Sequence, residues 1–196
     1  MSKRLRRREV VAELLAQRGD TLVIAGLGAP AWDITHAGDR DLNFPLWGAM
    51  GGAAMVGLGL ALAQPNRRVL VLTGDGEMLM GLGSLATIAV QRPRNLYIVV
   101  LDNERYGETG MQRTHTAHGV DLAAMAKAAG FARTQTVRTQ ADMSQLKKRI
   151  YAGAGALFAQ VKVDAEKLPL VLPPREGSWL KNRFRAALLG PDAAHQ

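Results

Sequence analysis

The stretch Val69-Leu70-Val71-Leu72-Thr73-Gly74-Asp75-Gly76 joins an unbroken apolar run to a polar turn. A second run, Leu96 to Asp102, leads into Asn103, which lies twenty-eight positions after Asp75. Each run has the length of a buried strand, and the intervening residues from Met78 to Arg92 are enough for a crossover helix. This part of the sequence therefore predicts a strand, a helix and a second, parallel strand.

Asp75 and Asn103 are expected at one edge of that sheet, where open α/β sheets bind their ligands. A carboxylate, an amide oxygen and a nearby backbone carbonyl suit Mg²⁺, which often completes its shell with phosphate oxygens. A helix that opens after Gly76 would point free N–H groups at the same anion. Asp-Gly and Asp-Asn are also common turn and helix-capping pairs, and these residues alone favour that plain structural role.

The rest of the chain alternates between helix and strand patterns. Helices are predicted over 4–17, 51–63, 122–129, 143–151 and 179–189, and further strands over 21–25, 134–137 and 156–163. This alternation is typical of an α/β fold with a doubly wound, mainly parallel sheet flanked by helices. We expect residues 1–196 to form a single domain, with a Gly/Pro loop after the first strand. A long polar loop over 103–120 is the candidate to close over a substrate.

Composition excludes several classes of protein. The chain has no cysteine, which excludes disulfides, thiolate zinc sites and iron–sulfur clusters within it. The longest weakly polar stretch, 50–63, is shorter than the span of about 20 residues that a membrane helix needs. The charge of +8 is concentrated near the start. Apolar residues at helical spacing in this segment indicate an amphipathic helix, with the basic residues on its solvated face. No motif typical of nucleic-acid binding accompanies the charge. We expect a cytoplasmic protein without membrane or nucleic-acid partners.

The Gly74-Asp75-Gly76 motif with Asp102-Asn103 resembles the cofactor motif of thiamine-diphosphate enzymes. Two upstream segments, Leu46 to Gly52 and Ala25 to Pro30, resemble the corresponding parts of the pyrophosphate-binding domain of these enzymes. Within that family the chain looks most similar to the β-type subunit of sulfopyruvate decarboxylase and to the matching half of phosphonopyruvate decarboxylase. The resemblance covers most of residues 20–110.

The resemblance implies roles for individual residues. Asp75, Asn103 and the backbone carbonyl of Arg105 would bind Mg²⁺. The Gly48 carbonyl would accept the 4′-amino group of the aminopyrimidine, and Met50 would lie between the two cofactor rings. The other positions expected to contact the cofactor are Gly28, Ala29, Ala49, Gly74, Gly76, Glu77, Tyr106 and Gly107.

Polar residues of the long loop are candidates for contact with the substrate: Glu108, Thr109, Gln112, Arg113, Thr114, His115 and His118. His115 and Glu108 are the candidate catalytic groups among them. Arg113 is the candidate to pair with a sulfonate or phosphonate through its planar guanidinium.

The implied reaction is non-oxidative decarboxylation of a small anionic 2-oxo acid to an aldehyde and CO₂, with thiamine diphosphate and Mg²⁺ as cofactors. The glutamate that activates the cofactor in this family lies on a pyrimidine-binding domain, and we expect an α-type subunit to supply it in a hetero-oligomer.

Four alternatives remain. Carboligation of the acetolactate synthase type uses the same domain. A β subunit of a 2-oxoacid oxidoreductase also shares it, although such subunits commonly carry cysteine-bound clusters. A nicotinamide enzyme is suggested by the Gly-x-Gly-x-x-Ala pattern of residues 26–31, which Pro30 disfavours. A binding module that has kept the fold without catalysis is the fourth.

Overall fold

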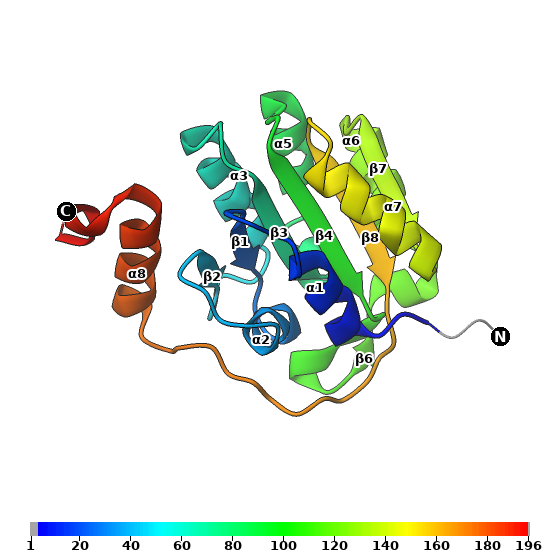
Figure 1. The fold of residues 1–196 in the computed structure, drawn as a ribbon. Coiled ribbons are helices and arrows are strands. Elements are labelled where there is room, and N and C mark those ends of the chain that lie inside the picture. Colours follow the sequence, from blue (N-terminus) through cyan, green and yellow to red (C-terminus); the bar gives the residue numbers. More distant parts are fainter. Residues whose placement is uncertain (1–3, 196) are drawn as a thin grey trace.

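The structure is a computed structural model that describes residues 4–195. Its centre is a six-stranded sheet in the order β2-β1-β3-β4-β8-β7 (Figure 1). The strands are β1 (Leu22–Ala25), β2 (Asn43–Pro45), β3 (Val69–Gly74), β4 (Leu96–Asp102), β7 (Arg133–Val137) and β8 (Leu157–Lys162). Every pairing between them is parallel, so all six carboxyl ends lie along one edge of the sheet. The predicted doubly wound α/β fold is confirmed.

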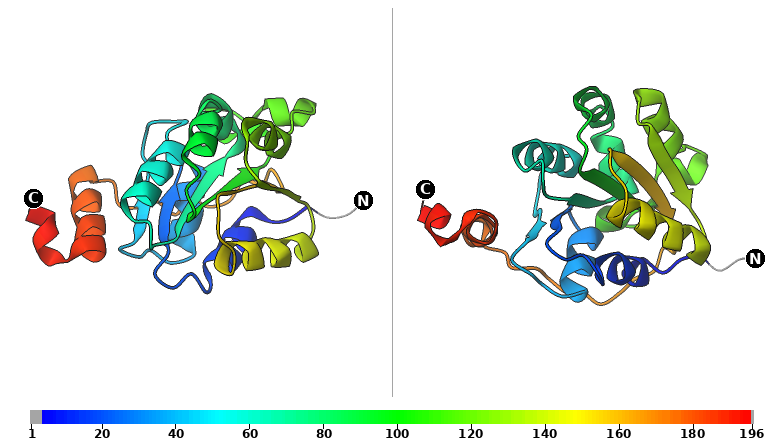
Figure 2. Two further views of the ribbon diagram at one scale, coloured as in Figure 1. Left: turned by 90° about the horizontal axis from the view of Figure 1, so that it is seen from above. Right: turned by 45° about the horizontal axis from the view of Figure 1, so that its top comes forward.

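Helices cover both faces of the sheet (Figure 2). One face packs against α1 (Arg7–Leu15), α2 (Ala29–His36) and α7 (Gln140–Tyr151). The other packs against α3 (Ala53–Ala63), α5 (Ser84–Gln91) and α6 (Leu122–Ala129). Because both faces are covered, all residues of β4 are buried, and its sequence is almost continuously apolar rather than alternating.

The chain reverses direction across the sheet beside β1. It leaves β1 through α2 to reach β2 on one side, and then returns through α3 to β3 on the other side. The segments that follow β1 and β3 therefore diverge to opposite faces. Such a switch point at the carboxyl edge is where open α/β sheets bind ligands.

Three predicted elements differ from the structure. The single crossover helix expected over 78–92 is wrong, since α4 (Asp75–Met80) and α5 are separate and Gly81 to Gly83 divide them. The Gly/Pro loop after β1 contains α2, whose first turn holds Pro30. The helix expected over 4–17 is α1, which spans Arg7–Leu15, because Leu5 is extended and bridges to Val163.

The basic residues near the start of the chain bind internal partners. Arg7 is buried and pairs with the buried Asp33, and Arg8 donates to the same carboxylate at 3.1 Å. Arg18 is also buried, and burial lowers its pKa to about 10. The expectation that this segment is a solvated basic face is therefore wrong for Arg7 and Arg18.

The segment over 103–120 was expected to lack structure, but it is folded. Its strands β5 (Arg105–Tyr106) and β6 (Gln112–Arg113) form an antiparallel hairpin around η1 (Gly107–Thr109), and η2 (His115–His118) follows. We call residues 105–118 the hairpin segment.

Beyond β8 the chain crosses the carboxyl edge of the sheet to α8 (Gly177–Leu189) on the opposite side (Figure 1), and η3 (Pro191–His195) ends the described part. We call residues 164–176 the strap. At its start, Asp164 N–H donates to Leu5 O at 2.9 Å. Near its end, Trp47 Nε1 donates to Pro174 O at 2.7 Å. Within residues 4–195, no helix combines the length and apolar character that a membrane crossing requires.

Candidate active site

A cleft of about 730 Å³ opens at the carboxyl edge of the sheet, beside the switch point. The segment after β1, the start of α4, the turn after β4, the hairpin segment and the strap all contribute to its walls. Most of the predicted site residues line this cleft: Ala29, Met50, Gly74, Asp75, Gly76, Glu77, Asn103, Arg105, Tyr106, Gly107 and Glu108. The fold therefore brings together predicted residues from four separate stretches of the sequence: Ala29, Met50, 74–77 and 103–108.

Four predicted residues lie beside the cleft without lining it. Gly28 has a φ of +80°, and a Cβ there would be 2.5 Å from Glu108 Oε1. Gly48 and Ala49 immediately precede Met50. His115 Nδ1 lies 3.3 Å from the Tyr106 hydroxyl on the exposed side of the hairpin segment. His115 is thus linked to the cleft through Tyr106.

Asp75 is the most perturbed acid at this edge. It is buried at the end of β3, its Oδ2 accepts a hydrogen bond from Thr114 Oγ1 at 2.5 Å, and Thr116 Oγ1 lies 3.2 Å from the same oxygen. Burial and the neighbouring Asp102 raise the pKa of Asp75 to about 6, while the threonine hydroxyls oppose the rise. A bound cation would favour the ionised carboxylate and reverse this shift, because opposite charge stabilises the charged form.

Asn103 begins a tight turn at the end of β4. Its Oδ1 accepts from Arg105 N–H at 2.9 Å, and the intervening Glu104 has a φ of +62°, in the left-handed region. The turn therefore holds the Asn103 side chain and the Arg105 backbone in a defined local arrangement.

The donor set at this edge tests whether a metal fits. Among the residues that the structure describes, no group of three or more His, Asp or Glu side chains is placed to hold a metal ion. A cation held through Asp75 and Asn103 would need backbone and phosphate oxygens as well, which is the way Mg²⁺ is usually bound. Both side chains line one cleft with room for a phosphate-bearing ligand, so the residues present fit the pair of Mg²⁺ and thiamine diphosphate.

Met50 is presented to the cleft by a turn with two unusual residues. Ala49 has a φ of +56° and Gly51 a φ of +92°. The Gly51 backbone rests against α4, where a Cβ on Gly81 would be only 2.1 Å from Gly51 O. The close contact between Gly51 and Gly81 therefore holds the turn that carries Met50 against the end of α4.

Glu77 connects the two sides of the switch point. Its Oε2 accepts from Thr73 Oγ1 at 2.7 Å, and a Cβ on Gly26 would be 1.6 Å from that oxygen. Burial raises the pKa of Glu77, although Thr73 and the backbone N–H groups of Gly51 and Ala53 lower it. Among residues 4–195, Glu77 Oε1 has no hydrogen-bond partner. The Glu77 side chain thus lies over Gly26, a contact that the sequence did not reveal.

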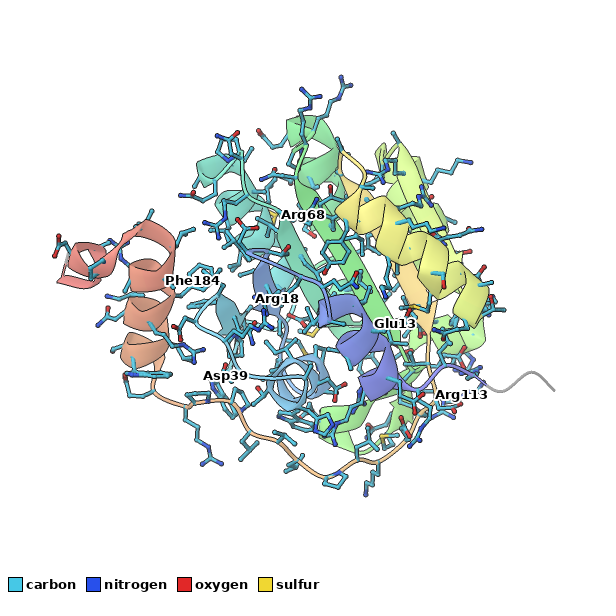
Figure 3. All side chains as sticks on the ribbon, viewed as in Figure 1. Glu13, Arg18, Asp39, Arg68, Arg113 and Phe184 are labelled. Atoms are coloured by element: carbon cyan, nitrogen blue, oxygen red, sulfur yellow. The ribbon has the colours of Figure 1, made fainter. Side chains whose placement is uncertain are left out.

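The structure separates the candidate substrate residues of the hairpin segment. Arg113 is exposed, donates to Ala117 O at 3.0 Å and lies at the periphery of the molecule (Figure 3). Thr114 is buried against Asp75 rather than facing the cleft. Glu108 and Thr109 line the cleft, whereas Gln112 and His118 do not.

Sequence reasoning missed the strap as a wall of the cleft. The strap residues Glu166, Lys167, Leu168, Pro169 and Leu170 all line it. The only signal was the position of Pro169 after the last strand, which marks a break in regular structure but not its course across the sheet edge. A second missed group is the buried set around Asp102, which includes Lys162 and Gln160.

Residues 32–161 match the family described as thiamine pyrophosphate enzyme, C-terminal TPP binding domain. The sequence is 42% identical to sulfopyruvate decarboxylase subunit beta of Methanothermobacter thermautotrophicus, over 81% of this chain and 82% of that one. The corresponding subunit of Methanococcus maripaludis is 32% identical, over 94% and 98%.

Longer proteins match over part of their length. Phosphonopyruvate decarboxylase of Streptomyces viridochromogenes is 38% identical over 89% of this chain, which spans 44% of that protein. Among solved structures, benzoylformate decarboxylase from Polynucleobacter necessarius aligns with a TM-score of 0.67 at 22% identity, over 85% of this chain and 34% of that one. A 4-hydroxybenzoylformate decarboxylase of Rhodococcus jostii aligns with a TM-score of 0.70 at 20% identity, over 86% and 34%. These structures show the same fold.

Proposed function

Because this chain belongs to the thiamine pyrophosphate enzymes, as their C-terminal TPP-binding domain, we propose that it is the β-type subunit of a Mg²⁺-dependent 2-oxo acid decarboxylase. The reaction is non-oxidative and yields an aldehyde and CO₂. The observation that carries the proposal is the meeting of Asp75, Asn103 and Met50 in one cleft at the switch point of the sheet.

Three oxygen donors of this chain would hold the metal: the Asp75 carboxylate, the Asn103 amide oxygen and the Arg105 carbonyl. Backbone N–H groups of Gly76 and Glu77 are suited to the diphosphate, since they lie at the start of α4 and both residues line the cleft. The Tyr106 ring lies over Gly76, where a Cβ would be 2.7 Å from the ring. This close packing keeps side-chain bulk away from the phosphate side.

Bound thiamine diphosphate supplies a nucleophilic carbon and an electron sink for decarboxylation. The residues of this chain position the cofactor and exclude water from the cleft. Met50 would support the cofactor rings, and the Gly48 carbonyl would accept a hydrogen bond from the 4′-amino group. Leu168 and Leu170 of the strap, with Leu27 and Met80, make the cleft walls largely apolar. An apolar wall favours loss of a carboxylate, because charge is less well solvated there than in water.

The partner proposed is an α-type subunit that carries the pyrimidine-binding domain and its catalytic glutamate. Support comes from the relatives that are named as beta subunits and that match this chain over most of their length. In the phosphonopyruvate decarboxylase of Streptomyces viridochromogenes the matching part is less than half of a longer chain. Both cases are consistent with an active site formed by two domains.

The substrate proposed is a small 2-oxo acid with a second anionic group, such as a sulfonate or phosphonate. Lys167 is the candidate to bind this group, because it lines the cleft from the strap and takes part in none of the ion pairs among the described residues. Its neighbour Glu166 is instead held by Arg6. Arg113, which the sequence suggested for this role, lies outside the cleft.

The test is reconstitution with the α-type subunit and a screen of 2-oxo acids for CO₂ release. We expect turnover only when both chains, thiamine diphosphate and Mg²⁺ are present, with preference for dianionic substrates. Full activity of this chain alone would refute the two-subunit site. Analysis of the organic product separates aldehyde formation from carboligation of the acetolactate synthase type.

A further inference from the structure

Asp102, the residue before Asn103, is a fully buried carboxylate with every acceptor site occupied. Its Oδ1 accepts from Glu104 N–H at 3.0 Å and from Thr116 Oγ1 at 2.8 Å. Its Oδ2 accepts from Gln160 Nε2 at 2.5 Å and lies 2.6 Å from Lys162 Nζ. A buried charge with this many partners is held in a single orientation.

A second carboxylate lies beside it. Thr116 Oγ1 is within hydrogen-bonding distance of both Asp102 Oδ1 and Asp75 Oδ2, at 2.8 Å and 3.2 Å. Asp75 and Asp102 are both nearly excluded from solvent. Two neighbouring buried carboxylates repel one another, and a nearby positive charge offsets this repulsion.

Lys162 supplies that positive charge from the neighbouring strand. It is paired in register with Asp102 across β4 and β8, and its side chain is only 8% exposed. Its Nζ lies 2.6 Å from Asp102 Oδ2 and 3.1 Å from Glu104 Oε1. The same ammonium therefore binds the residue before Asn103 and the residue after it.

The turn that Lys162 binds is one that needs support. Glu104 is a non-glycine residue with a φ of +62°, a left-handed conformation that is unfavourable unless its surroundings stabilise it. Arg4 also binds Glu104, at 3.0 Å, but from the solvent side, where its own side chain is 44% exposed. Lys162 is thus the buried member of the pair of cations on this turn.

We propose that Lys162 is a positioning residue for the metal-binding turn: by binding Asp102 and Glu104 together, it sets the orientation of Asn103 and of the Arg105 carbonyl toward Mg²⁺. This inference rests on the proposed function. Lys162 is not among the residues that line the cleft proposed for substrate and cofactor. Its effect is therefore on affinity for the metal and diphosphate, through the geometry of the turn.

The test compares Lys162→Met with matched variants in the chain reconstituted with its α-type subunit. Calorimetry measures the affinity for Mg²⁺ at saturating thiamine diphosphate, and circular dichroism checks folding. We expect Lys162→Met to weaken Mg²⁺ binding on the order of tenfold or more, as is typical when a residue supporting a metal ligand is lost. Arg4→Met, which removes the exposed ion pair to Glu104, is the control and should change the affinity less than about twofold.

A second background separates positioning from a general loss of stability. Asp102→Asn keeps the shape and the acceptor for Glu104 N–H but needs no counter-charge. In the Asp102→Asn background, Lys162→Met should therefore weaken Mg²⁺ binding less than about threefold, so that the two substitutions are clearly non-additive. This background also serves if Lys162→Met alone does not fold.

The following results would overturn the positioning role of Lys162. Unchanged Mg²⁺ affinity in folded Lys162→Met, or an equal loss in the presence and absence of Asp102→Asn, overturns the inference while the proposed function stands. A loss that Arg4→Met reproduces in full also overturns it. If the wild-type pair of subunits takes up no thiamine diphosphate, the proposed function fails and this inference fails with it.

Discussion

The Thr114 hydroxyl donates a 2.5 Å hydrogen bond to Asp75 Oδ2, joining the hairpin segment to the end of β3. Thr114 is fully buried, and its N–H also bonds to Glu104 O at 3.1 Å. One threonine therefore ties together the two proposed metal-ligand segments, which are far apart in the sequence. The hydrogen bond to the buried Asp75 carboxylate therefore helps to hold the hairpin segment in its fold.

Replacing Thr114 tests this link. In Thr114→Val the shape is retained but one donor to Asp75 is lost, so the carboxylate is less well oriented for a cation. We expect Mg²⁺ affinity in the presence of thiamine diphosphate to fall about tenfold. Thr109→Val is the matched control on the same segment, since the Thr109 hydroxyl bonds to Gln112 instead. Equal affinities in calorimetry of the two variants would contradict the link.

The raised pKa of Asp75 predicts a pH-dependent stability in metal-free protein. The folded pKa is about 6, above the ordinary value, so the folded state holds this proton more tightly than the unfolded state does. The group therefore destabilises the fold above about pH 6, and this penalty disappears as the pH falls toward about 4. Asp75→Asn should be more stable than wild type by about 1–3 kcal/mol at pH 7.5, and similar near pH 4.

Asp142→Asn supplies the contrast of opposite sign. Backbone hydrogen bonds in the capping box of α7 lower the pKa of Asp142, so its ionised form stabilises the fold at neutral pH and this contribution is lost in acid. Denaturant unfolding in a chelating buffer across this range measures both variants. If the stability of the wild-type protein relative to Asp75→Asn increased with rising pH, the raised pKa of Asp75 would be refuted.

The contact between Gly51 and Gly81 predicts that substitution by alanine is much more destabilising at Gly81 than at Gly83. In Gly81→Ala the new Cβ would be 2.1 Å from the Gly51 carbonyl oxygen, so the Met50 turn must move away from α4. We expect a loss of stability of about 2 kcal/mol or more, together with a fall in turnover of the reconstituted enzyme. Gly83→Ala meets nothing within 4 Å and should be close to neutral in thermal unfolding.

Lys167→Met tests the anion-binding role of the strap. Losing one ammonium at the cleft should raise the KM for a dianionic 2-oxo acid about tenfold or more while changing the KM for pyruvate little. Arg113→Met, outside the cleft, should affect both substrates equally and weakly. Steady-state kinetics with the two substrates measure the ratio. A selective effect of Arg113→Met would restore the role that the sequence suggested for it.

The central strands could be predicted because burial on both faces leaves a direct mark on sequence. The strand predicted to end at Gly74 and the one over 96–102 agree with β3 and β4, and the helix predicted over 122–129 agrees with α6, which Asp121 caps. The positions of Asp75 and Asn103 at one sheet edge follow from the parallel pairing of those strands.

Other features depend on contacts between distant residues and left no local pattern. The break at Gly81 to Gly83 reflects the approach of Gly51, some thirty positions earlier, which no helical periodicity records. The hairpin segment has a polar sequence typical of a loop, and only its contact with Asp75 shows why Thr114 and Thr116 are buried. Lys162 reads as the polar end of a strand until its register with Asp102 is known.

The course of the strap has a practical consequence for anyone preparing the protein. Its inner residues face the cleft, but its supports come from the other end of the chain: Leu5 bridges Val163, Arg6 binds Glu166 and Arg8 donates to Pro169 O. An expression boundary drawn a few residues into the basic start would leave the Gly74-Asp75-Gly76 motif untouched and still release one wall of the cleft. Fusion tags are therefore best separated from this end by a generous spacer.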